Sequence, residues 1–149
     1  MPTRLVKKID RALIGFSQHH ALQIARAAFF VVYFWFGVLK VVGVSPASPL
    51  VDALLAVTLP AVDPATFNVL FGLFEMAIGT LFLFSKFDRV TLPVFVAHIV
   101  MTTLPLFLLP SLVWTAPFVP TMEGQYILKN LVLVALAAAI VARMKKIDA

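Results

Sequence analysis

Four long apolar runs dominate the pattern of hydrophobic and polar positions along this chain. Each is close to the twenty or so residues that an α-helix needs to cross the hydrocarbon of a bilayer, and each contains at most two charged side chains. The predicted transmembrane spans cover residues 21–43, 66–85, 90–109 and 124–143. The pattern therefore predicts an all-α integral membrane protein, a four-transmembrane-helix bundle in a single membrane domain over residues 1–149.

A shorter amphipathic pattern precedes the first span, over about residues 3–17. Apolar residues recur there at helical spacing, and basic residues lie on the other side. The apolar positions are Leu5, Ile9, Leu13 and Phe16, and the basic ones are Arg4, Lys7, Lys8 and Arg11. We interpret this segment as an amphipathic interfacial helix on the cytoplasmic leaflet. The following run is long enough to span and lacks a nearby small-residue cleavage site, so we expect no removable signal peptide.

The two connections at the opposite end, at about residues 44–65 and 110–123, are apolar and interrupted by prolines. We expect them to be outer capping loops that cover that end of the bundle, because irregular backbone near the membrane is tolerated only against protein or water. The stretch from Pro49 to Leu59 is a candidate short interfacial or partly re-entrant helix, and Trp114 is expected near the lipid headgroups.

Most of the basic residues gather on one side of the predicted membrane and do not form a basic surface of the kind that binds nucleic acid. The net charge is +5, but Lys and Arg gather before the first span, in the turn at residues 85–89, and after the fourth span, whereas the two outer connections contain neither. The positive-inside rule then predicts that both termini are cytoplasmic and that the protein lies in the cytoplasmic (inner) membrane. We expect the lipid bilayer, and no nucleic acid, as a partner.

Composition excludes several redox chemistries. Hydrophobic residues make up 62% of the chain and cysteine is absent. The chain therefore supplies no thiol for disulfide exchange, iron–sulfur binding or a thiolate metal site. Histidine spacing favours no metal or haem site either, since His98 alone lies well inside a span.

Polar residues follow one face of three predicted spans and the outer half of the fourth. Because polar side chains in membrane helices face one another and not lipid, these faces are expected to meet inside the bundle. The faces contain Arg26, Tyr33, Gly37 and Lys40; Asn68, Gly72, Glu75 and Gly79; Thr91, His98, Thr102 and Pro105; and Gln125 with Lys129.

Depth along the helices indicates which of these side chains can meet. At 1.5 Å per residue, Glu75 and His98 lie within roughly 3 Å of the midplane. Lys129 lies roughly 7 Å and Lys40 roughly 12 Å outward, and Arg26 roughly 9 Å inward. A lysine stem can extend about 6 Å, so Lys129 could reach Glu75, and Lys40 could reach either the pocket or the outer surface. The sequence thus predicts an outward-facing polar pocket.

Two interpretations of this pocket stay open. With both lysines ionised, the pocket has surplus positive charge and would favour a small anion or the carbonyl of a quinone; alternatively, some groups are neutral and pass protons, a role that suits His98. Against both stands a structural explanation. In it, Glu75 and Lys129 form an ion pair between helices, while Lys40 and Arg26 extend to the two membrane surfaces.

Short motifs along most of the chain resemble the DoxX-like family of small four-helix membrane proteins. The motif residues are the segments 26–30, 36–40, 72–75 and 124–130, together with His98. The resemblance implies a four-helix bundle with redox associations, such as the membrane subunit of a thiosulfate:quinone oxidoreductase. It also implies that Arg26, Gly37, Lys40, Glu75, His98 and Lys129 are polar-core residues.

These observations lead to three function hypotheses. The first is a redox-associated membrane subunit that binds a quinone-like or small anionic ligand, with quinone as the candidate cofactor. The others are a small-solute or proton-coupled transporter and a non-catalytic scaffold or assembly factor. No soluble domain is recognisable, so we expect no stand-alone enzyme, and the chain would work with a partner subunit or as a homo-oligomer.

Overall fold

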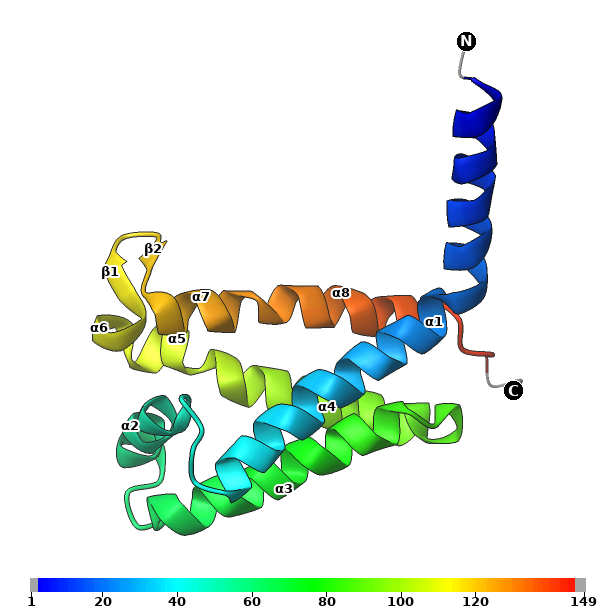
Figure 1. The fold of residues 1–149 in the computed structure, drawn as a ribbon. Coiled ribbons are helices and arrows are strands. Elements are labelled where there is room, and N and C mark those ends of the chain that lie inside the picture. Colours follow the sequence, from blue (N-terminus) through cyan, green and yellow to red (C-terminus); the bar gives the residue numbers. More distant parts are fainter. Residues whose placement is uncertain (1–2, 147–149) are drawn as a thin grey trace.

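Helices form almost the whole of the computed structural model, which describes residues 3–146 (Figure 1). Four helical segments in this part of the chain are long and apolar enough to cross a membrane, as the sequence predicts. The described residues also form a two-stranded antiparallel ribbon. The elements are α1 (Arg4–Val41), α2 (Ser48–Thr58), α3 (Pro64–Phe82), the 3-10 turn η1 (Ser85–Phe87), α4 (Asp88–Thr103), α5 (Pro105–Leu108), α6 (Pro110–Val113), β1 (Trp114–Ala116), β2 (Val119–Pro120), α7 (Met122–Leu128) and α8 (Asn130–Val141).

The amphipathic segment and the first span form one continuous helix, α1, and not two separate elements. No proline or glycine lies between residues 16 and 36 to end the helix. The helix is nevertheless strongly bent: its N-terminal part, dark blue in Figure 1, runs across the direction of α7 and α8. Every side chain from Thr3 to His19 is exposed. This part of α1 therefore lies outside the bundle, and its contact with a lipid leaflet stays a prediction.

Local capping explains where α3 begins. The Asp63 carboxylate accepts a hydrogen bond of 2.8 Å from the Thr66 backbone N–H, and Pro64 occupies the first helical position, where its missing N–H costs nothing. That N–H also holds the pKa of Asp63 below its usual value, because it stabilises the charged carboxylate. At the other end, η1 turns the chain directly into α4.

The third span consists of α4 and α5, separated at Leu104. Pro105 has no N–H to continue the helical ladder, and the Met101 carbonyl accepts a 3.3 Å hydrogen bond from Leu104 instead. The helix resumes at once because proline suits a first helical position. The fourth span is likewise divided, into α7 and α8, at Lys129.

The outer connections are more ordered than loops. The stretch expected to form a short helix does so as α2. In the second connection, β1 pairs with β2, and the Trp114 indole N–H donates to the Leu106 carbonyl at 3.1 Å. This ribbon was not predicted, since strands of two and three residues leave little periodic signal. Both connections lie at the same end of the bundle, left in Figure 1.

Glycines bring α1 and α3 into backbone contact, and this pair of helices packs more extensively than any other. A Cβ atom at Gly37 would collide with the Gly72 carbonyl oxygen, and one at Gly72 would lie 2.6 Å from the Gly37 oxygen. Small residues permit such close approach between membrane helices. The approach places Lys40, one turn beyond Gly37, opposite Glu75, one turn beyond Gly72.

Replacing Gly37 with alanine is expected to destabilise the protein by about 1–3 kcal/mol, since the obstructing atoms are backbone and cannot rotate away. Gly15→Ala is the matched control, because a Cβ there meets nothing within 4 Å. It should be neutral or stabilising by up to about 1 kcal/mol through helix propensity. Denaturant titration in detergent micelles measures both, and equal effects would argue against the close contact.

Candidate functional site

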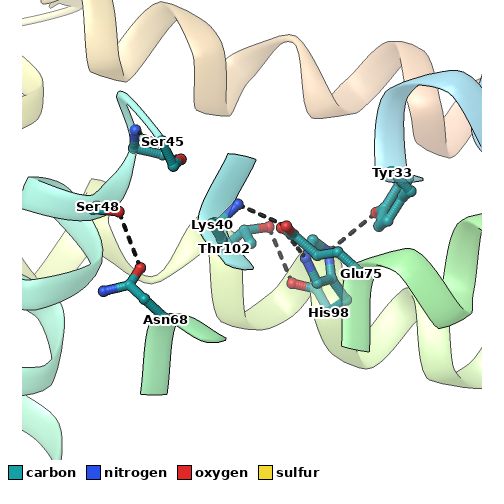
Figure 2. A network of polar contacts seen from close by, with 9 residues as sticks. Tyr33, Lys40, Ser45, Ser48, Asn68, Glu75, His98 and Thr102 are labelled. Carbon is teal, nitrogen blue, oxygen red and sulfur yellow. Dashed lines mark hydrogen bonds and ion pairs between the residues drawn. The ribbon is translucent and has the colours of Figure 1, made fainter. Parts of the chain in front are cut away.

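Four side chains from three spans form one buried hydrogen-bonded chain (Figure 2). Lys40 Nζ donates to Glu75 Oε2 at 2.7 Å, and Glu75 Oε1 lies 3.1 Å from His98 Nε2. His98 Nδ1 in turn lies 3.0 Å from the Tyr33 hydroxyl oxygen. We call these four residues the relay cluster.

Helical spacing positions each member of the relay cluster. Tyr33 and Lys40 are seven residues apart on α1, about two turns, so both face α3 and α4. Glu75 is central on α3 and His98 on α4. Each of the four residues is at most 5% exposed. The sequence pattern correctly selected these side chains as facing one another.

Glu75 holds the cluster together because each of its oxygens has a separate partner. Buried charges are tolerated when they are paired and hydrogen-bonded. With His98 neutral, the Lys40 ammonium and the Glu75 carboxylate balance one another. The expected surplus of positive charge is therefore wrong for this arrangement, since only one lysine enters the cluster.

The hydrogen-bond directions in the relay cluster depend on the protonation state of His98. In the neutral form, the Tyr33 hydroxyl donates to Nδ1 and the Nε2–H donates to Glu75. In the protonated form, both ring nitrogens donate, so the Tyr33 hydroxyl must rotate to become an acceptor. A proton on His98 is thus linked to a reorientation of Tyr33.

Aromatic rings enclose the relay cluster. Phe71 stacks on His98 with ring centroids 5.2 Å apart and an interplanar angle of 13°. Lys40 Nζ lies 5.5 Å from the centre of the same ring, close enough for a cation–π interaction. Phe71 thus packs against both partners of Glu75, His98 and Lys40.

Lys129 and Gln125 do not join the cluster, contrary to prediction. Both are exposed, and Lys129 Nζ lies 4.6 Å over the Tyr126 ring. The reason is the rotation of α7, which is fixed by Gly124: a Cβ there would collide with the Val113 carbonyl. Lys129, five residues on, then lies about 140° round the helix. The position of Lys129 along its predicted span was compatible with a contact to Glu75, but the helix rotation fixed by the packing of Gly124 excludes that contact.

Asn130 takes the inward position on the fourth span instead. Its amide donates to the Thr102 hydroxyl at 3.3 Å, and Thr102 donates to the His98 carbonyl at 3.0 Å. Asn130 lies in the motif segment 124–130 but was not predicted as a site residue. The sequence signal was that two polar residues, Lys129 and Asn130, are adjacent in one predicted span. Which of them faces the interior depends on the rotation of the helix about its axis.

Arg26 belongs to a second buried layer, separate from the relay cluster. Its guanidinium forms a bidentate pair with Asp88 at 2.7 and 2.6 Å and also donates to the Phe82 carbonyl at 2.8 Å. Asp88 is 4% exposed and was missed as a site residue. The signal was available, because Asp88 is the one acidic residue of the turn at residues 85–89.

A third polar group lies at the outer end, between α2 and α3. The Asn68 amide donates to Asp52 at 2.8 Å, and the Ser48 hydroxyl donates to the Asn68 oxygen at 3.2 Å. Asn68 was recognised on the polar face of its span, but its partners in the outer connection were not. We call Ser48, Asp52 and Asn68 the outer cluster.

With all its side chains already hydrogen-bonded, the relay cluster is better suited to proton transfer than to ligand binding. Within residues 3–146, no buried side-chain nitrogen or oxygen lacks a hydrogen-bond partner, and no set of three metal-ligating side chains comes together. The larger hollow, about 380 Å³, is lined by residues 114–118, and a second, about 230 Å³, lies along α4 and α5. Lys40 and His98 have the donors that a quinone carbonyl needs, but both are already paired. A quinone therefore does not fit here without displacement of a cluster bond.

Comparison with known proteins finds no match for this chain among protein-family models, curated proteins or solved structures. The DoxX-like resemblance consequently stays a prediction.

Proposed function

We propose that this chain is a DoxX-like multi-pass membrane protein that handles protons as a redox-associated membrane subunit. The observation that carries the proposal is the unbroken chain of Tyr33, His98, Glu75 and Lys40, four titratable side chains joined by contacts of 2.7 to 3.1 Å in the interior. Titratable groups inside membrane spans cost several kcal/mol unless paired and commonly mark proton paths.

The proposed work of the cluster is to accept one proton and redistribute it. A proton that reaches Glu75 neutralises the carboxylate and weakens its hold on Lys40 and His98. The interior then contains an uncompensated lysine charge, which is unfavourable at low dielectric. Proton uptake is therefore coupled to a second event that restores neutrality, such as loss of the Lys40 proton or entry of an anion.

We propose the redox association on the basis of the DoxX-like resemblance, and the absence of cysteine limits the role that this chain can play in it. The chain has no cysteine, so electrons would come from a partner redox protein, and this chain would supply membrane anchorage and protons. A quinone-like or small anionic ligand would have to displace one partner of Glu75, with Lys40 as the group that receives its oxygen. We place the protein in the cytoplasmic membrane on the basis of its charge asymmetry.

Infrared spectroscopy of the protein in lipid vesicles tests proton binding directly. We expect a pH-dependent carboxyl band that disappears in Glu75→Gln, and a histidine signal whose titration midpoint moves in Tyr33→Phe. Tyr126→Phe is the matched control, since that ring is exposed and outside the cluster. Identical pH titrations in the parent protein and in Glu75→Gln would exclude the proposal.

A proton-coupled transporter is the second candidate, and the Lys40 and Glu75 pair favours it. Such a pair can bind a substrate anion at Lys40 when Glu75 is protonated, which couples the two events. Vesicles with an imposed pH gradient would then accumulate a small organic anion, and Lys40→Met would abolish the accumulation. Absence of flux alongside normal Glu75 titration would favour the redox-associated subunit.

A further inference from the structure

We infer that the relay cluster exchanges protons with the outer face of the bundle alone, through the contact between α2 and α3. This inference rests on the proposed function and adds the direction of access. Two independent features carry it: an apolar barrier on one side of the cluster and a line of polar groups on the other.

Aromatic packing closes the inner side, beyond Tyr33. The Phe29 and Phe82 rings stack with centroids 3.9 Å apart, and Phe95 contacts both edge-on at 5.3 and 5.6 Å. All three are at most 1% exposed. These rings contain no group that can pass a proton, so the relay chain ends at Tyr33.

The polar layer beneath the aromatic rings does not continue the path. Arg26 is fully engaged with Asp88 and the Phe82 carbonyl. The nearby Thr91 hydroxyl is fully buried and donates to the Phe87 carbonyl at 2.9 Å. No described polar side chain therefore bridges the aromatic layer between Tyr33 and Arg26.

Polar groups continue on the outer side of the cluster. Asn68 lies seven residues before Glu75, two turns further out on the same face of α3. In Figure 2, Ser45, Ser48 and Asn68 lie on the Lys40 side of the cluster, opposite Tyr33. Lys40 itself lies in the last turn of α1. It is therefore the member of the cluster nearest to this outer end.

Helix α2 is the cover of this route. Its Ser48 and Asp52 bind Asn68 through two hydrogen bonds, and its Leu55 is 4% exposed. The ring of Phe71, one turn from Asn68 on α3, has its centre 5.5 Å from the Lys40 Nζ. Separation of α2 from Asn68 would admit water to Lys40, and a proton would then pass to Glu75.

The groups that face Glu75 define its electrostatic surroundings. They are Lys40 and Tyr33 from α1 and His98 from α4, with Asp52 of α2 further outward. The described part of the fourth span contributes no charge, because Lys129 points away. Asp52 is the titratable group of the outer cluster.

One-sided pH jumps on vesicles that contain the full chain test the direction of access. The carboxyl band of Glu75 is followed by infrared spectroscopy, with Glu75→Gln as the reference. Because the natural chain has no cysteine, Phe118→Cys labelling by a membrane-impermeant thiol reagent reports the orientation of the protein. We expect the band to follow the pH on the side of the β1–β2 ribbon and to ignore the pH on the other side.

Asn68→Ala tests the route itself. It removes both hydrogen bonds that hold α2, so we expect proton exchange from the outer side to become about three- to tenfold faster. Asn130→Ala is the matched control, a partly buried amide that binds Thr102 off the proposed route. Equal exchange rates in the two variants would overturn the route through α2 and α3.

The outcomes separate the two proposals. A Glu75 band that follows the inner pH, or both sides equally, overturns one-sided access and leaves proton handling intact. A band that responds to neither side overturns proton handling and one-sided access together.

Discussion

Replacing Glu75 with leucine is expected to destabilise the protein by about 3–5 kcal/mol. The substitution leaves the Lys40 ammonium buried without a carboxylate and removes the acceptor of the His98 Nε2–H. The free-energy cost of leaving the lysine charge buried without a partner is larger than the cost of losing the attraction between the two charges. The free energy of unfolding, from denaturant titration in lipid–detergent micelles, measures the effect.

The double variant Lys40→Met/Glu75→Leu separates charge from shape. Replacement of both partners by apolar side chains of similar size is often neutral or stabilising, so most of the lost stability should return. The coupling energy of the double-mutant cycle would then be large. A double variant as unstable as Glu75→Leu alone would mean that packing, and not the unpaired lysine, causes the loss.

Replacing Asp88 with leucine is expected to cost about 3 kcal/mol for a related reason. Arg26 keeps its hydrogen bond to the Phe82 carbonyl but loses both contacts with the carboxylate. The variant should also release the turn between α3 and α4 from α1, because Asp88 is the first residue of α4. Thermal unfolding in micelles and hydrogen exchange at residues 85–89 measure the two effects.

Arg26→Met/Asp88→Leu is the paired control, and it should recover stability as the double variant of the relay cluster does. Asp10→Leu is the surface control, since Asp10 is exposed on the N-terminal part of α1 and should change stability by less than about 0.5 kcal/mol. An equal loss in Asp88→Leu and Asp10→Leu would contradict a stabilising role for the buried pair.

The four long apolar helical segments were predictable because each depends on a long local signal. An apolar run of about twenty residues specifies a membrane helix whatever its neighbours do. Asp63 with Pro64 likewise marks the start of α3 from local chemistry. The bend of α1 and the β1–β2 ribbon were not predicted, because neither the bend nor the short strand pairing has a strong local pattern.

The site was predictable in part. Helical spacing correctly gathered Tyr33, Lys40, Glu75 and His98, since a shared face needs only the helical repeat. It could not choose between Lys40 and Lys129 as the partner of Glu75. Both lysines are within reach by depth, and the choice depends on the rotation of each helix about its axis.

The sequence by itself determined the four long apolar helical segments and the polar side of the first three, because hydrophobicity and helical periodicity are local properties of the chain. Tertiary structure alone decided which charges pair. The contact between Gly37 and Gly72 places Lys40 over Glu75, the packing of Gly124 turns Lys129 outward, and the turn before α4 brings Asp88 to Arg26. Ion pairing requires atoms within about 4 Å, and that precision comes from packing between helices.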